Sequence, residues 1–231
     1  MADLFSDGFE SGNLTAWNAN DGGGDFTAHA DAALHGSYGG KVVINDTDWK
    51  FVQDETPSSE TRYRCRFYLD PNALSMAEGS YFEIMRGISE SWALVPFQFF
   101  CIKNSGVYKV QIVAGRDSGG ALQGGGYTIT DEPHCIEIDW YKSSGGNNGF
   151  LSLWVDGTLK ETLSSLDNDT FNVGRVRWGA GFFSGAISGT IFLDDFASNN
   201  DGTLIGLLHK WNKATISKFN GVKVTKWNGV V

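Results

Sequence analysis

Two groups of polar residues have the types and spacings that chemistry on sugars would need. Glu137 and Asp139 are two residues apart, and Arg62, Arg64 and Arg66 follow the same alternation. Because side chains two apart in a β-strand point to one face, each group would present its charges together. Glycoside hydrolysis uses such a pair of carboxyl groups. A polysaccharide lyase would use an arginine to neutralise a uronate beside a Tyr or His base.

The spacing of the carboxyl pair argues against hydrolysis. A retaining hydrolase holds its carboxyl groups about 5 Å apart, whereas neighbours on one strand face are about 6.5 to 7 Å apart. We therefore expect Glu137 and Asp139 to face water, and the arginine stripe to be solvated or salt-bridged. A lyase or hydrolase stays as the alternative to a noncatalytic function. The residues that could join the arginines in a lyase site are Tyr81, Arg86, Tyr108, Lys109 and His134.

Other kinds of catalytic site lack their motifs. The glycine-rich stretch from Gly115 to Gly126 has no Lys-Ser/Thr pair, which a phosphate-binding loop requires. No G-x-S-x-G nucleophile motif occurs. The remaining histidines, His29, His35 and His209, have no metal-ligand spacing to one another. The sequence gives no support to nucleotide, nucleophilic or zinc chemistry.

The three cysteines, Cys65, Cys101 and Cys135, are widely separated, and each lies in an apolar or alternating segment. Their number is odd, so one of them has no partner within the chain. A free thiol in such a segment behaves as a small buried hydrophobe. We expect three buried free thiols.

Alternation of apolar and polar residues dominates the chain and predicts strands rather than helices. Glycines beside aromatics, as in the stretch from Trp178 to Phe183, indicate bent strands. Many strands separated by turn residues, without helices between them, predict an antiparallel sandwich or barrel. The nine predicted strands are 39–44, 62–69, 80–88, 93–102, 107–113, 134–141, 150–155, 175–183 and 188–196.

The composition limits the partners. The 231 residues are 41% hydrophobic and 13% aromatic, which is too apolar for a disordered chain, and the formal net charge is -9. An acidic chain gains nothing from counterion release on phosphates, so we expect no nucleic-acid partner, and acidic polysaccharides are disfavoured for the same reason. No apolar run reaches the roughly 20 residues that span a bilayer, and Met1–Leu4 lacks the features of a signal peptide. We therefore expect neither membrane insertion nor signal-directed export.

The composition changes after residue 200, and an eight-residue repeat begins at Lys210. Its copies are 210–217, 218–225 and the truncated 226–231, and each starts with Lys, an aromatic residue and Asn. An Asn-Gly pair is a strong turn signal, so each repeat is predicted to be a turn plus a short strand. Such a unit could pack on the sandwich, on copies of itself or on another protein, and repetition favours the last two. We predict a body of residues 1–200 and a docking or oligomerisation tail of residues 201–231, with Trp211, Phe219 and Trp227 as the docking side chains.

Three segments resemble laminin-G-like, concanavalin-A-like jelly-roll domains. Residues 5–17 (FSDGFESGNLTAW) resemble the opening of such domains, residues 134–157 their central hairpin, and residues 191–196 (IFLDDF) their closing strand. The resemblance covers roughly residues 3–199. It implies an all-β, antiparallel two-sheet jelly-roll sandwich, and it says little about function because this fold hosts lectins, enzymes and structural modules.

The resemblance also implies a structural Ca²⁺ ion near the first and last strands. Glu10 and Asp195 are the candidate ligands, with Asp194 and Asp7 less favoured, and backbone carbonyls would complete the shell. The alternative is that Asp194 and Asp195 only end a strand at the solvent. Jelly-roll glycosidases resemble the pattern E-x-D-x-x-E, and Lys142 stands at its third position here, so the triad is broken.

The tail is similar to aromatic-Asn-Gly-Val repeats of phage and phage-like virion structural proteins. This similarity favours a noncatalytic, homo-oligomeric module on a virion or particle surface, as a decoration or tail-fibre component that docks on other subunits and binds glycans. Glycan binding needs exposed aromatic faces. Trp92 follows polar residues and is the candidate exposed ring, whereas Trp49, Tyr141, Trp154 and Trp178 are expected in the core.

Overall fold

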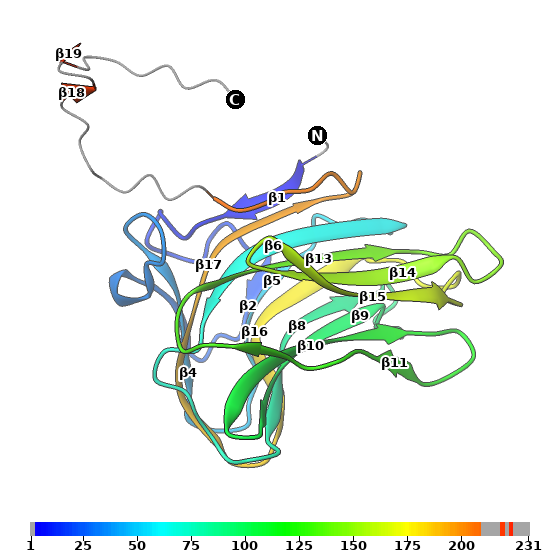
Figure 1. Ribbon diagram of the computed structural model, residues 1–231, viewed down its shortest axis with the longest axis horizontal. Coiled ribbons are helices and arrows are strands. Elements are labelled where there is room, and N and C mark those ends of the chain that lie inside the picture. The colour runs from blue at the N-terminus through cyan, green and yellow to red at the C-terminus, as the bar shows by residue number, and fades with distance from the viewer. Residues whose placement is uncertain (1–2, 209–217, 220–221, 224–231) are drawn as a thin grey trace.

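The computed structural model describes residues 3–208, 218–219 and 222–223. Residues 3–208 form two antiparallel β-sheets that pack face to face (Figure 1), together with the short 3₁₀ turn η1 (Ala30–Ala32). No helix within these residues is long and apolar enough to cross a bilayer. The predicted all-β sandwich is confirmed.

The first sheet has nine strands, with β17 at its centre. In Figure 1, β1 lies beside β17, so the first and last strands of the sandwich are neighbours. Within the described residues, strands β1 (Asp3–Asp7) and β7 (Ser75–Met76) pair with β17 alone. The others follow the order β15 (Thr158–Leu166), β14 (Gly149–Val155), β13 (His134–Tyr141), β6 (Arg62–Asp70), β17 (Ile187–Asn199), β4 (Gly39–Ile44) and β3 (Phe26–His29).

The second sheet has eight strands and covers the inner face of the first. Strand β12 (Tyr127–Ile129) pairs with β10 outside the main order. That order is β11 (Ala121–Gln123), β10 (Val107–Gly115), β9 (Phe97–Asn104), β8 (Tyr81–Ile88), β16 (Arg175–Ser184), β5 (Lys50–Asp54) and β2 (Ala19–Asn20).

The core lies between the sheets and is rich in aromatic rings. Trp178 is fully buried, and its ring centroid is 5.2 to 5.9 Å from those of Phe196, Phe67, Trp17 and Phe9. Each fully buried ring contributes about 1.5 to 3 kcal/mol. Both sheets supply these rings, so the core holds the sheets together.

The three thiols are free and buried, as predicted. Burial raises the pKa of Cys101 and of Cys135 to about 12, and it raises the pKa of Cys65 further. A thiol that stays protonated is a poor nucleophile and metal ligand. These cysteines are therefore inert packing residues.

All nine predicted strands exist, and residues 39–44 and 134–141 have the predicted bounds. Strand β9 begins at Phe97 rather than at residue 93, because Pro96 cannot donate to a strand ladder. Alternation did not predict β1, β5 or β15. Strand β15 exposes most of its side chains at the edge of its sheet, so it carries little hydrophobic signal.

Residues 200–208 form a segment, here called the strap, that lies on the nine-stranded sheet. The carboxylate of Glu137 accepts hydrogen bonds from the backbone N–H groups of Ile205 and Gly206 at 2.8 and 3.0 Å. The hydroxyl of Tyr68 accepts one from the N–H of Leu208 at 2.9 Å. The chain that follows the predicted boundary at residue 200 thus stays bound to the sandwich as far as Leu208.

The expectation that Glu137 and Asp139 face water is wrong, since they are only 3% and 2% exposed. Strand β13 pairs with β6, which places the two acids opposite the arginine stripe. Arg64 donates to Glu137 at 2.6 Å and to Asp139 at 3.1 Å, and Arg62 donates twice to Asp139. The strap covers this network, because Arg64 also donates to the carbonyl of Gly202. Arg62 and Arg64 of the stripe are thus salt-bridged, whereas Arg66 donates to the backbone carbonyl of Asp195.

Part of the repeat is described by its backbone alone. Strand β18 (Lys218–Phe219) pairs with β19 (Val222–Lys223), and these strands flank the predicted Asn-Gly turn of the second repeat. Trp211 and Trp227 lie outside the described residues, and of Phe219 only the strand is described. The docking role of these three residues stays a prediction.

Candidate functional site

A line of polar side chains crosses the outer face of the eight-stranded sheet. Strand register places Gln123, Val113, Gln98, Arg86, Arg177 and Gln53 opposite one another, from β11 to β5. We call its five polar members, Gln53, Arg86, Gln98, Gln123 and Arg177, the polar row. Their neighbours Phe97, Phe99 and Val176 are fully buried. Alternation therefore turns the polar row away from the core.

Arg86 is fixed by a buried carboxylate. Its Nε and Nη2 atoms donate to the two oxygens of Glu83 at 2.7 and 2.9 Å, and the amide of Gln98 donates to the same carboxylate. Burial raises the pKa of Glu83, and the hydrogen bonds from Arg86 partly oppose this effect. Glu83 thus holds two members of the polar row in place.

Two further arginines lie beside aromatic rings. Arg175 pairs with Glu55 at 3.1 Å, and its guanidinium carbon is 4.0 Å from the centroid of the Trp92 ring. The guanidinium carbon of Arg177 is 4.3 Å from the centroid of the Phe51 ring and 5.0 Å from that of Trp92. Cation–π contacts of this kind orient the guanidinium groups.

Trp92 is 49% exposed, as expected for the candidate ring. It lies in the loop between β8 and β9 with φ at 63°, and its N–H donates to the carbonyl of Ser89 at 3.0 Å. A bulky residue rarely adopts this left-handed conformation, and such strain occurs at functional sites. The loop therefore presents a half-exposed aromatic ring beside Arg175 and Arg177.

The other aromatic residues expected in the core divide into two groups. Trp178 is in the core. Trp49, Tyr141 and Trp154 are partly exposed. The ring centroid of Trp49 is 4.9 Å from the guanidinium carbon of Arg86, so Trp49 belongs to the outer face of the eight-stranded sheet. Sequence reasoning missed Trp49 because it directly precedes a strand that alternation did not predict.

A groove of about 450 Å³ opens at the Gln98 end of this face. Bulges in β16 turn Phe182 outward, with φ at 48° and 54% of the residue exposed. The amide of Gln123 donates to Gln111 at 2.7 Å along the groove wall. The lining residues are Tyr81, Gln98, Phe100, Ile102, Gln111, Val113, Ala121, Gln123 and Phe182.

A second polar group surrounds the bulge in β17. Asp194 is fully buried, so the alternative that both aspartates end a strand at the solvent is wrong. Its Oδ2 atom accepts from the N–H groups of Leu34 and His35 at 2.9 Å each, and its Oδ1 atom from the N–H of Asp195 at 2.7 Å. Burial raises the pKa of Asp194 to about 7. Asp194 is thus engaged with the backbone.

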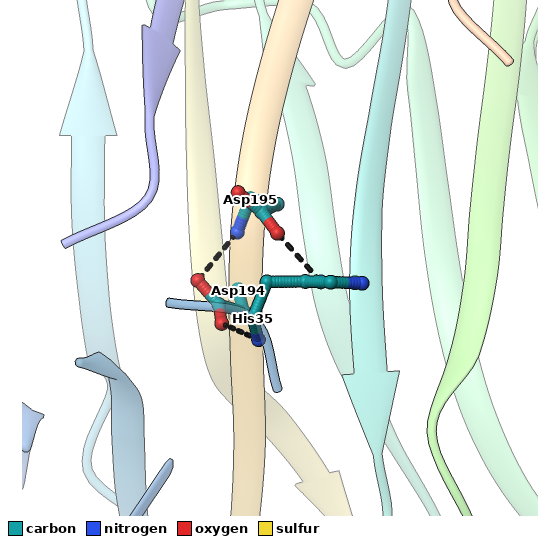
Figure 2. A group of neighbouring side chains, drawn as sticks. All are labelled: His35, Asp194 and Asp195. Carbon is teal, nitrogen blue, oxygen red and sulfur yellow. Dashed lines mark hydrogen bonds and ion pairs between the residues drawn. The ribbon is translucent and has the colours of Figure 1, made fainter. Parts of the chain in front are cut away.

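Asp195 has φ at 49° and points toward His35, whose Nδ1 atom is 2.6 Å from its Oδ2 atom (Figure 2). Glu10 accepts from the N–H groups of Ser37 and Tyr38 at 2.9 and 3.1 Å. Both carboxylates line a groove of about 310 Å³ near Asp7 and Arg66. Burial raises the pKa of Asp195, the charges of His35 and Arg66 oppose this rise, and the Glu10 charge adds to it. Glu10 and Asp195 share this groove, whereas both oxygens of Asp194 already accept backbone hydrogen bonds.

The arginines predicted for a lyase site do not meet the other predicted residues. The stripe of Arg62, Arg64 and Arg66 belongs to β6 in the nine-stranded sheet, whereas Arg86 belongs to β8 in the other sheet. The ring of His134 contacts Asp156 at 2.7 Å in the nine-stranded sheet. The remaining predicted members, Tyr81, Tyr108 and Lys109, lie on β8 and β10.

No protein-family pattern and no curated protein sequence matches the chain. Solved structures match it over most of its length. The cellulose-induced protein Cip1 superposes with a TM-score of 0.61 and 18% identity, over 88% of this chain and 100% of Cip1. The fold is a two-sheet jelly roll.

Two other jelly rolls are similar in structure. The carbohydrate esterase of the Shiga toxin-encoding bacteriophage phi24B has a TM-score of 0.58 and 13% identity, over 85% of this chain and 97% of the esterase. The alginate lyase Aly36B, as a mutant with an alginate tetrasaccharide, has a TM-score of 0.51 and 13% identity, over 89% of this chain and 95% of the lyase. At these identities the likeness establishes the fold alone.

Proposed function

We propose that this jelly roll is a noncatalytic glycan-binding module whose site is the outer face of the eight-stranded sheet. The observation that carries the proposal is the exposed Trp92 ring, held on left-handed backbone beside Arg175 and the polar row. Sugar rings pack on aromatic faces, and amide and guanidinium groups hydrogen-bond to hydroxyls. The groove at Phe182 and Gln98 extends the same surface.

The carboxylates on or near the candidate site are already paired with other residues, which favours glycan binding over glycoside hydrolysis. Glu83 is buried and bonded to Arg86 and Gln98, and Glu55 is paired with Arg175. Glycoside hydrolysis needs one carboxyl group as proton donor and another as base or nucleophile at the sugar. Glu137 and Asp139, the pair that sequence spacing offered for this role, are covered by the strap. A hydrolase is therefore the weaker candidate. A lyase is weaker as well, because Arg62 and Arg64 of the arginine stripe are already paired with Asp139 and Glu137.

The structural neighbours lend general support. One is a phage carbohydrate esterase and another an alginate lyase bound to an alginate tetrasaccharide, so proteins of this fold handle carbohydrates. This support concerns the fold, since the identities are low. The argument for this chain rests on its own aromatic and polar residues.

The setting we propose is the surface of a virion or phage-like particle, where the chain is a homo-oligomeric decoration or tail-fibre component. The basis is the C-terminal repeat, with Trp211, Phe219 and Trp227 as the residues that dock on neighbouring subunits. The strap supports this arrangement, because its bonds to Glu137 and Tyr68 anchor the chain up to the start of the repeat. Force on the tail would therefore pass to the nine-stranded sheet.

We also propose a structural Ca²⁺ ion held by Glu10 and Asp195, with Asp194 behind them and backbone carbonyls completing the shell. The basis is the groove that the two carboxylates share. The ion would stabilise the junction between the first strand and β17, and it has no catalytic role in this proposal.

A glycan array tests the proposed function. The intact chain should bind at least one class of oligosaccharide, and Trp92→Ala should lose that signal. Tyr38→Ala is the matched control, because Tyr38 is also an exposed aromatic residue but precedes β4 in the other sheet. An array without any bound glycan, or equal signals for wild type and Trp92→Ala, would refute the proposal.

A further inference from the structure

The three arginines on the outer face of the eight-stranded sheet have different partners. Arg86 is bonded twice to Glu83, and Arg175 is paired with Glu55. Arg177 donates from Nε to the neutral side chain of Gln53 at 2.8 Å. No carboxylate in the described part of the chain is within ion-pair distance of Arg177. The face therefore has one more cation than its own acids neutralise.

The surroundings of Arg177 make this unmatched charge unfavourable. Burial lowers its pKa, and repulsion from Arg86 and Arg175 lowers it further. An unpaired charge that is partly removed from water is costly, and a bound anion offsets that cost. The site is thus complementary to a negative group that this chain does not supply.

The geometry of Arg177 suits a planar anion. Its Nε atom is used by Gln53, which leaves the edge formed by its two terminal nitrogens. The rings of Phe51 and Trp92, at 4.3 and 5.0 Å, restrict the guanidinium plane. A preorganised guanidinium edge matches a carboxylate with two parallel hydrogen bonds. The exposed Trp92 ring beside it can carry a pyranose.

We propose that the site binds a sugar that bears a carboxylate, with Arg177 as the bidentate partner of the carboxylate and Trp92 as the stacking surface. This inference rests on the proposed function, because it names the ligand class of the same face. Uronic acids and sialic acids both have the required group.

The net charge of -9 alone disfavours acidic polysaccharides. At the site, the charges of nearby residues matter more than the net charge of the whole chain. At physiological ionic strength the screening length is about 8 Å, so acids far from the face contribute little. Arg86, Arg175 and Arg177 lie on the face itself, against Glu55 and Glu83.

Titration calorimetry of the full chain tests the ligand class. The probes are mannuronate, guluronate and galacturonate tetrasaccharides and sialyllactose, each also as its methyl ester. Cellotetraose and sulfated cellotetraose, which have no carboxylate, are the neutral and sulfated comparisons. We expect a carboxylated probe to bind and its methyl ester to bind at least about tenfold more weakly. Arg177→Gln should lose a similar factor, whereas Arg177→Lys should keep part of the affinity because it keeps the charge without the planar edge.

Lys160→Gln is the matched control, since it removes one positive charge from the exposed edge strand β15 of the other sheet and should leave binding unchanged. Melting temperatures of all variants identify any loss of folding, and Arg177→Lys keeps the test decisive if Arg177→Gln unfolds. Tight binding of cellotetraose, of sulfated cellotetraose alone, or of a methyl ester without loss would overturn the inference and leave glycan binding intact. Failure of every oligosaccharide, here and on the array, would overturn the proposed function itself.

Discussion

Arg64 and Glu137 form a buried ion pair beneath the strap, with Nε and Oε1 2.6 Å apart. Each is about 5% or less exposed. The pair joins two strands of the nine-stranded sheet to the segment that leads into the repeat, because Glu137 also binds the backbone of Ile205 and Gly206. The carboxylate that sequence spacing offered as a catalytic group is instead an anchor.

Replacing one partner of this pair should destabilise the protein strongly. Glu137→Gln removes one of the two buried counter-charges of Arg64, leaving Asp139, and weakens the bonds to the strap. Loss of one member of a buried pair costs about 3 to 5 kcal/mol. Urea unfolding measures the change. Glu132→Gln, at an exposed position, is the control. A change below about 0.5 kcal/mol for Glu137→Gln would mean that the pair contributes no net stability.

Asp54 should make stability depend on pH. It is fully buried, one of its oxygens accepts from the N–H of Thr56, and the other has no hydrogen-bond partner among the described residues. Burial raises its pKa, so the folded state favours the protonated form and loses stability as pH rises above about 4, the ordinary value for an aspartate.

The variant Asp54→Asn keeps an acceptor for Thr56 and cannot ionise. The melting temperature of Asp54→Asn relative to that of the wild type should therefore rise between pH 4 and pH 8. A difference that stays constant across this range would show that Asp54 does not carry the effect.

Calcium should raise the melting temperature, because an ion that binds only the folded state adds stability by mass action. The comparison is between the chelated protein and the same protein in millimolar Ca²⁺. Asp195→Asn should abolish the difference, and Asp31→Asn, at an exposed carboxylate outside the groove, should preserve it. Equal melting temperatures with chelator and with Ca²⁺ would show that no stabilising calcium ion binds.

Deleting the repeat should abolish assembly and leave the sandwich folded. The contacts of Ile205, Gly206 and Leu208 place the cut at residue 209 rather than inside the strap. The truncated chain should keep its melting temperature within a few degrees and should run as a monomer in light scattering. Unchanged oligomeric state or particle incorporation would contradict the docking role of the tail.

Alternation predicted the strands that bury one face, because apolar residues such as Phe97 and Phe99 recur at every second position in them. It did not predict β15 and β1, whose pairing depends on a neighbouring strand rather than on their own apolar content. The burial of Glu137 also could not be predicted from the sequence. It depends on the register between β13 and β6 and on the return of residues 200–208, both set by contacts between distant segments.

The candidate site was predictable in one part only. The polar neighbours of Trp92 predicted its exposure, and the structure confirms it. The polar row combines residues from five strands whose order in the sheet differs from their order in the chain, so no local pattern brings Arg86 next to Arg177 or Gln98. The polar residue Gln98 within the apolar run from Phe97 to Cys101 was the available signal for an outward position.

A crystal structure of the chain with the oligosaccharide that the array selects tests the central claim most directly. The account predicts a sugar ring in contact with the exposed face of Trp92, with its polar groups bonded to Arg177 or another member of the polar row. A sugar bound on the nine-stranded sheet or in the groove beside Glu10, with Trp92 free, would contradict it.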